Sequence, residues 1–231
     1  MYQLYIANRN YSSWSLRPWL LLRVLDIPFA EKLEPFLQAD NFAAFRQFAP
    51  NGKVPCLVHG EQVVWDSMGI VEYLYEQHSQ VWPAASAART WARCASAEMH
   101  SGFSALRADC TMNIGLSVRL NTISTALQRD IERIDELWNE GLQQFGGPYL
   151  AGQDFSAVDA FYAPVVFRVR TYGLVLSAPA QAYVDRMLAL PGMLDWEAAA
   201  LAEPYREAAH EAEVLEVGQI LADRRLPLGA K

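Results

Sequence analysis

The sequence has few of the residues that build disulfide frameworks or metal centres. It contains three cysteines among 231 residues, and no two of them form a Cys-x-x-Cys pair. Neither a dithiol redox pair nor a zinc knuckle is therefore indicated. The four histidines are scattered and lack the His-x-x-x-His spacing of a helical metal site. We expect ordinary thiols in a reducing compartment and no bound metal.

The chain also lacks an excess of positive charge and a long apolar run. Its 26 acidic and 19 basic residues give a net charge of −7, so no basic face for nucleic acid or anionic lipid is predicted. No apolar segment approaches the roughly 20 residues that a membrane span needs, and the first ten residues lack the apolar core of a signal peptide. These absences predict a soluble cytoplasmic protein without nucleic-acid or membrane partners.

What the chain does have is apolar and aromatic content, at 52% and 12% of its residues, which is typical of a folded globule. The first 80 residues alternate short strand and helix signals in the order β-α-β-α-β-β-α. Strands are expected at 2–7, 30–37, 54–58 and 62–65, and helices at about 13–26, 40–48 and 67–77. Ser13 or Ser15 is the expected N-cap of the first helix and Ser67 that of the third.

After residue 78 the pattern changes, and residues 78–86 resemble a linker. No convincing strand is predicted from residue 87 onward. Helical stretches are expected at about 87–111, 119–145, 156–172, 178–189, 193–202 and 205–224. The sequence therefore predicts two domains: an α/β domain over residues 1–80, with helices on both sides of a sheet, and an all-helical domain over residues 87–225.

Four motifs lie in order on this layout. They are Asn10–Arg17 (NYSSWSLR), Asn51–Leu57 (NGKVPCL), Trp65–Ser67 (WDS) and Tyr149–Asp159 (YLAGQDFSAVD). In this order and spacing they resemble the cytosolic glutathione transferases over nearly the whole chain, to about residue 225. The resemblance implies a thioredoxin-like N-terminal domain that binds glutathione, an all-α C-terminal domain that completes the pocket for a second substrate, and a homodimer.

The second and third motifs imply the glutathione-binding residues. By resemblance, the Val54–Pro55 bond is cis, so that the Val54 backbone pairs with the cysteinyl part of the tripeptide like an added strand. Lys53 would meet the glycine carboxylate. Ser67, at a helix start, would hold the γ-glutamyl carboxylate, and Asp66 would face its ammonium.

The first motif implies the chemistry. The thiol of glutathione has a pKa near 8.5, so only about 3% is thiolate at pH 7, and lowering that pKa by two units needs about 2.7 kcal/mol. A serine hydroxyl and a helix N-terminus can stabilise the anion. Ser12 lies five residues before Arg17, as in serine-type classes, whereas a Ser-Trp-x-Leu likeness points to Ser13. Tyr5 is the tyrosine-type alternative, and the absence of cysteine argues against the thiol-transferring classes.

An apolar electrophile is expected between the domains. The candidate pocket residues are Tyr11, Trp14, Arg107, Met112 and Asn113, of which Trp14 and Met112 could equally be ordinary packing residues. The expected activity is transfer of glutathione to this electrophile. A ligand-binding module without turnover and a glutathione-dependent reductase, peroxidase or isomerase remain open.

The serine pair also resembles the zeta class, whose activities include isomerising maleyl-type substrates. Trp14 stands where that class has cysteine, and the loop after the first strand is longer. These departures argue against isomerase activity and place the chain closer to uncharacterised bacterial relatives.

The fourth motif has a structural role. Ser156 and Asp159 resemble a capping box, in which each side chain bonds a backbone amide at the start of a helix. We expect truncation of Asp159 to impair folding and to leave the chemistry intact.

Overall fold

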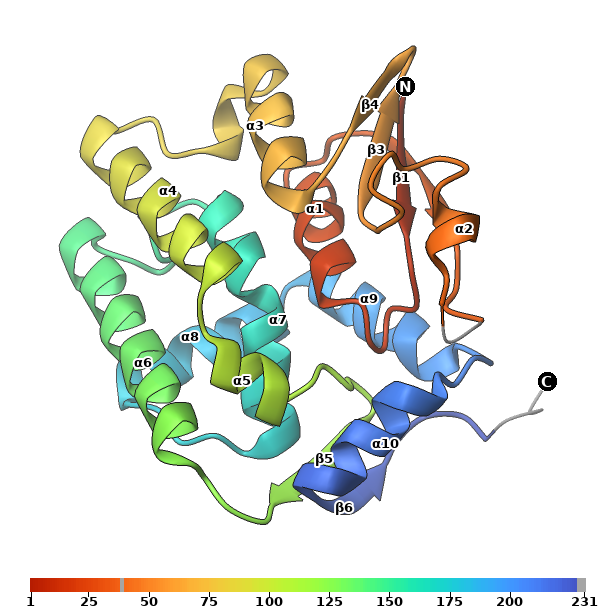
Figure 1. Ribbon diagram of the computed structural model, residues 1–231. Helices are drawn as coiled ribbons and strands as arrows, with labels where there is room; N and C mark the ends of the chain where they lie inside the picture. The colour runs from red at the N-terminus through yellow and green to blue at the C-terminus, as the bar shows by residue number, and fades with distance from the viewer. Residues whose placement is uncertain (38–39, 228–231) are drawn as a thin grey trace.

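The N-terminal part of the computed structural model, which describes residues 1–37 and 40–227, is a four-stranded sheet with helices on its faces (Figure 1). The strand order is β2-β1-β3-β4, with β1 parallel to β2 and antiparallel to β3. The strands are β1 (Tyr2–Ile6), β2 (Phe29–Leu33), β3 (Cys56–His59) and β4 (Gln62–Val64), and the helices are α1 (Ser13–Val24), α2 (Phe42–Phe45) and α3 (Ser67–Gln77). The predicted β-α-β-α-β-β-α order is confirmed.

The C-terminal part is mainly helical, as predicted. A 3-10 turn (Ser79–Val81) leads into it, and its helices are α4 (Ser86–Ser101), α5 (Ser104–Asp109), α6 (Thr125–Phe145), α7 (Ala157–Tyr172), α8 (Ala178–Leu188), α9 (Pro191–Ala202) and α10 (Ala208–Val217). Helix α7 is the central one, because nearly all of its residues are buried. Within the described residues, none of the helices combines the length and apolar content needed to span a membrane.

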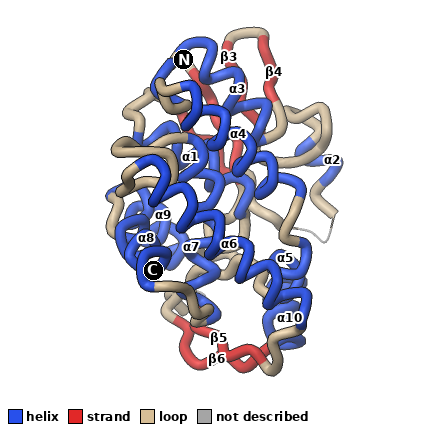
Figure 2. The backbone as a smooth tube through the Cα atoms, turned by 90° about the vertical axis from the view of Figure 1, so that its left-hand side faces the viewer, coloured by secondary structure: helices blue, strands red, loops and turns tan. Residues whose placement is uncertain are grey.

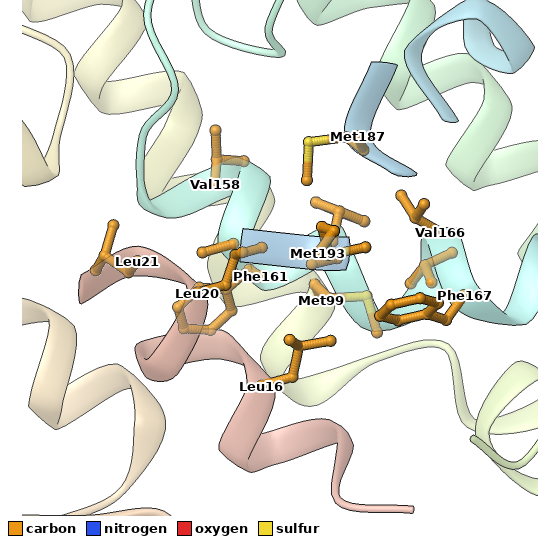
Figure 3. Close-up of a cluster of buried hydrophobic side chains, with 14 of the residues drawn as sticks. Leu16, Leu20, Leu21, Met99, Val158, Phe161, Val166, Phe167, Met187 and Met193 are labelled. Atoms are coloured by element: carbon orange, nitrogen blue, oxygen red, sulfur yellow. The ribbon is translucent and has the colours of Figure 1, made fainter. Parts of the chain in front are cut away.

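One continuous core joins the two parts. Helix α1 packs against α7 and α9 as well as against β1 and α3. Figure 3 shows Leu16 and Leu20 of α1 pointing toward Phe161 of α7 and Met193 of α9. All four side chains are at most 1% exposed. The start of α1 is therefore held rigidly between the sheet and the helices.

The capping box at the start of α7 is confirmed. The Asp159 carboxylate accepts the Ser156 amide at 2.9 Å and the Leu150 amide at 3.0 Å, and the Tyr183 hydroxyl donates to it at 3.1 Å. Asp159 is fully buried. The motif thus connects the loop before α7, α7 itself and α8 through a single side chain.

The prediction that no strand follows residue 87 is wrong. Strands β5 (Leu116–Leu120) and β6 (Gly218–Asp223) pair antiparallel beside α10, at the end of the helical part away from the four-stranded sheet (Figure 2). Strand β5 alternates apolar and polar residues as Leu-Ser-Val-Arg-Leu, but it is short, and its partner β6 lies about 100 residues later in the chain, so only the tertiary fold brings the two together. The helix expected over 205–224 accordingly ends at Val217.

Two expected N-caps are also corrected. Ser12, not Ser13 or Ser15, precedes α1, because its amide donates to the Asn8 carbonyl at 2.8 Å and so fixes the turn one residue earlier. At α3 the N-cap is Asp66, whose carboxylate accepts the Met68 amide at 2.9 Å, and Ser67 is the first helical residue. A carboxylate also interacts favourably with the helix dipole, which favours Asp66 at the cap.

Candidate active site

A cavity of about 670 Å³ opens between the start of α1, the α2 region, α5 and α10. Residues 11–14, at the end of the loop after β1 and the start of α1, line it together with residues of the helical part, and Figure 1 shows this loop running toward that part. Eight of the predicted site residues contribute to its lining, and six of them come from the start of α1 and the helical part: Tyr11, Ser12, Ser13, Trp14, Arg107 and Met112. Lys53 and Val54 line the same cavity from the segment before β3. The fold therefore brings the first two sequence motifs and the helical part to a single place.

The two candidate serines differ in how their hydroxyl groups are used. The Ser12 hydroxyl lies 2.7 Å from the Ser15 hydroxyl, which also accepts the Ala7 amide at 3.3 Å. Among the described residues the Ser13 hydroxyl has no hydrogen-bond partner. Ser13 is the first residue of α1, where the unpaired amides of the first turn create a partial positive charge. The start of α1 thus offers one uncommitted hydroxyl at a site that favours an anion.

The segment before β3 has the backbone conformation that its motif predicts. The Val54–Pro55 bond is cis, and Val54 reaches the cavity while Pro55 is buried beneath it. Gly52 has φ +64°, and a Cβ there would lie 2.4 Å from the Phe42 ring. Only glycine satisfies both conditions. This turn places the exposed Lys53 side chain at the cavity edge.

Asp66 and Ser67 lie at the start of α3 and do not line this cavity. Ser67 is buried, and the Arg17 guanidinium donates to its hydroxyl at 3.4 Å. Asp66 is partly exposed and lies 3.3 Å from the His100 imidazole. Burial is the main cause that lowers the pKa of His100, and the Asp66 carboxylate opposes it.

Helix α10 covers the loop after β1 through a buried polar network. The Tyr11 hydroxyl donates to Glu211 at 2.8 Å, and Arg225 binds both Glu211 oxygens at 2.5 and 2.9 Å. Burial, together with Glu211, raises the pKa of Tyr11 to about 12. The Asn113 side chain donates to the same carboxylate at 3.0 Å. Tyr11 therefore stays protonated at neutral pH, and Asn113 lies behind the cavity wall, not on it.

Several cavity residues were not found from the sequence. Arg168 of α7 and His210 of α10 both line the cavity. Arg168 belongs to a helix whose sequence predicts a buried core element, and His210 is not part of any recognisable motif. Tyr5, the alternative catalytic residue, was considered from the sequence but does not line the cavity. Its ring stacks on the Phe48 ring, with 4.3 Å between the two centroids.

Metal and thiol chemistry find no support in the side chains of this site. Within residues 1–37 and 40–227, no group of three or more metal-ligating side chains lies close enough to hold an ion. Cys56 and Cys110 are buried, and Cys94 is exposed. None of the three lines the cavity.

Cys94 is expected to be the one thiol that a polar alkylating reagent modifies in the folded protein. Burial raises the pKa of Cys56 to about 11 and that of Cys110 to about 12, so neither forms appreciable thiolate at about pH 7.5. Mass spectrometry should show one adduct on the native chain and three after denaturation. A second adduct on the native chain would contradict the buried positions of Cys56 and Cys110.

A thioredoxin-like domain joined to a helical domain, with a cavity that residues of both line, is the architecture of glutathione-dependent transferases. The family model for the glutathione S-transferase N-terminal domain matches residues 11–77, and that for the C-terminal domain matches residues 121–199. Together the two matches cover more than half of the chain. The chain belongs to the glutathione S-transferase family.

Three individual proteins are similar to this chain at 20–29% identity. A probable maleylacetoacetate isomerase of Caenorhabditis elegans is 29% identical over 182 residues, which are 75% of this chain and 81% of that protein. Glutathione S-transferase 1 of Dianthus caryophyllus is 24% identical over 180 residues, which are 74% of this chain and 79% of that protein. The solved structure of a glutathione transferase homologue from Burkholderia GL BGR1, with bound glutathione, has a TM-score of 0.66 at 20% identity and covers 86% of this chain and 97% of that one. At this identity the structural likeness shows the fold.

Proposed function

We propose that the protein binds glutathione in this cavity, stabilises its thiolate at the start of α1 and adds the sulfur to an electrophile. The observation that carries the proposal is the position of Ser13. Its free hydroxyl and the N-terminus of α1 share the cavity with Lys53 and Val54, in a chain of the glutathione S-transferase family. The Burkholderia neighbour with bound glutathione supports the choice of ligand.

Each residue then has a defined role. The Val54 backbone, which reaches the cavity, would pair with the cysteinyl residue of the tripeptide. Lys53 would bind the glycine carboxylate. The γ-glutamyl end would extend beyond the cavity to Asp66 and Ser67 at the start of α3, where the buried Arg17 behind Ser67 adds positive charge. Trp14 and Met112 would contact the second substrate.

The energetic requirement is modest for these groups. Lowering the thiol pKa by two units needs about 2.7 kcal/mol. A hydroxyl donating to the thiolate contributes about 1.5–3 kcal/mol, and a helix N-terminus adds about 0.3–1 kcal/mol. Ser13 and the first turn of α1 can therefore supply the shift without a cationic side chain.

Calorimetry with reduced glutathione tests the proposal, together with the ultraviolet absorbance of the thiolate as a function of pH. Saturable binding with a bound-thiol pKa about two units below that of free glutathione is expected. No saturation at millimolar glutathione would refute the proposal. Saturation with an unshifted thiol pKa would instead favour a ligand carrier.

Replacement of Lys53 by methionine is expected to weaken glutathione binding about fivefold and to leave kcat nearly unchanged. The Lys53 side chain is exposed, so an ion pair with the glycine carboxylate is worth at most about 1 kcal/mol. Lys32→Met, at an exposed position on β2, is the matched control. If the two variants bound glutathione with equal affinity, Lys53 would not be part of the binding site.

Isomerisation is a second candidate, favoured by the relative described as a probable maleylacetoacetate isomerase. In that reaction the thiolate adds to a double bond and leaves again, so glutathione is regenerated. Assays with a maleyl-type acid would separate the two activities by whether glutathione is consumed. Trp14, in place of the zeta-class cysteine, argues for the transferase.

A further inference from the structure

Three guanidinium groups interact electrostatically beside the cavity, two of them buried and the third, that of Arg107, partly exposed. We call Arg17, Arg107 and Arg168 the arginine cluster. The cations of Arg107 and Arg168 lower the pKa of Arg17, and that of Arg107 lowers the pKa of Arg168, after the larger effect of burial in both cases. Arg17 and Arg168 are 1% and 4% exposed. Three like charges are thus concentrated beside the cavity, two of them on side chains that are almost fully buried.

Among the described residues, no carboxylate lies within ion-pair distance of these three groups, although the charge of Asp66 raises the pKa of Arg17 in opposition to burial. Arg168 donates to the backbone carbonyls of Cys110, at 2.6 Å, and Pro164, at 3.3 Å. Arg107 likewise donates to two carbonyls, those of Gly102 and Met99. Asp130 raises the pKa of Arg107 by its charge, but it lies beyond ion-pair distance and accepts the Leu106 amide.

Several other arginines of the chain are paired with carboxylates. Arg133 binds Glu98 and Glu136, and Arg225 binds Glu211 and Asp223. Burial lowers the pKa of Arg168 to about 10, so it remains protonated at neutral pH. A buried cation without a counter-ion is costly, and an anion that binds beside it recovers much of that cost.

The arginine cluster faces the part of the cavity proposed for the second substrate. Arg107 and Arg168 line the cavity together with Thr111 and Met112. The Arg17 and Arg107 guanidiniums lie over the Trp14 ring, 4.2 and 5.0 Å from its centroid. The Thr111 hydroxyl is buried and has no partner among the described residues. Two cations and one free hydroxyl are the groups that recognise a carboxylate.

We propose that the second substrate is anionic, with a carboxylate that docks on Arg107 and Arg168 while its electrophilic carbon faces the glutathione sulfur. This inference rests on the proposed function and narrows its substrate class from apolar electrophiles to carboxylate-bearing ones. The α10 wall carries Glu207 and Glu213, which repel a carboxylate there. Trp14 and Met112 supply the apolar contact for the rest of the molecule.

A matched pair of probes tests the proposal on the unmodified protein. Chlorodinitrobenzoate and its methyl ester both react by forming a carbon–sulfur bond and releasing chloride, and the thiol proton goes to solvent. After division by the uncatalysed rate of each probe, kcat/KM should be about tenfold or more higher for the carboxylate. Equal values, or a preference for the ester, would overturn the proposal.

Variants of Arg107 identify the group responsible. Arg107→Met should remove most of the preference for the carboxylate, Arg107→Lys should keep part of it, and the Kd of glutathione should change less than about twofold in both. Arg186→Met, at an exposed arginine that also donates to a backbone carbonyl, is the control. If Arg107→Met lost glutathione affinity by as large a factor as it lost preference for the carboxylate, the arginine would bind the tripeptide, and this result would overturn the proposal.

Direct binding separates this inference from the proposed function. Titration of the protein alone with each probe, followed by tryptophan fluorescence, reports the anion site without glutathione or turnover. Tighter binding of the carboxylate, lost in Arg107→Met, supports the site even if calorimetry detects no glutathione binding. Equal binding of both probes contradicts it even if glutathione is conjugated.

Discussion

Replacing Ser13 by alanine is expected to lower kcat for glutathione conjugation about tenfold to a hundredfold at neutral pH. The change removes a hydrogen bond from a hydroxyl to a thiolate, which is worth about 1.5–3 kcal/mol. The first turn of α1 remains, because alanine is a good residue in a helix. The bound thiol should therefore have a higher pKa in the variant, which a pH profile of kcat measures directly.

The direction of the pH effect identifies the mechanism. If Ser13 acts by stabilising the thiolate, the variant needs a higher pH to form the same fraction of thiolate. Its deficit should accordingly shrink above about pH 9, where free glutathione is itself mostly ionised. A deficit that stays constant with pH would mean that Ser13 positions the substrate and does not shift its pKa.

Ser12→Ala is the matched control. The Ser12 hydroxyl already pairs with Ser15 at 2.7 Å, so its loss is expected to cost less than about fivefold in kcat. A large loss of kcat in Ser12→Ala, with no loss in Ser13→Ala, would mean that Ser12 and not Ser13 stabilises the thiolate. Unchanged kcat in both variants would exclude a serine-based mechanism.

The largest effect on stability is expected for Asp159→Ala, which should lower the free energy of unfolding by about 3–5 kcal/mol. The substitution removes one acceptor from three buried donors, namely the amides of Leu150 and Ser156 and the Tyr183 hydroxyl. Each unsatisfied buried donor costs about 1–3 kcal/mol. Urea denaturation measures the loss, and Asp154→Ala, at an exposed position in the same loop, should leave the midpoint nearly unchanged.

The same carboxyl group predicts a pH dependence. Burial raises the pKa of Asp159 to about 6, and its hydrogen bonds oppose that shift only in part. Because the pKa is higher in the folded chain, the folded state binds more protons, and the stability gained by protonation is lost as pH rises through about 6. The difference between wild type and Asp159→Ala should therefore be larger at about pH 5 than at about pH 8. An identical difference at both values would contradict the raised pKa.

Local patterns predicted the N-terminal half of the fold well. The alternation of Tyr2, Leu4 and Ile6 marked β1, and the Ser156–Asp159 pair marked the start of α7. The turn before β3 could also be predicted, because the residue types of the Asn-Gly-Lys-Val-Pro segment favour the conformation that it adopts. In each case the determining interaction lies within a few residues of the chain.

The parts that were missed depend on contacts between distant segments. Strands β5 and β6 pair with each other although about 100 residues separate them in the chain. Arg168 enters the cavity because of how α7 packs, and Asn113 turns away from it to reach Glu211. Sequence periodicity cannot separate a buried arginine that lines a cavity from one that is enclosed by the core, so the charge of the second-substrate site was not visible before the fold.

The network around Glu211 makes one wall of the pocket depend on segments that are far apart in the chain. Arg225 binds this carboxylate, and its guanidinium also reaches the Tyr11 hydroxyl, 214 residues away in sequence. The turn that leads into α1 is instead fixed by a hydrogen bond between near neighbours, from the Ser12 amide to the Asn8 carbonyl. The pocket thus combines a locally encoded anion site with a wall that exists only through long-range contacts.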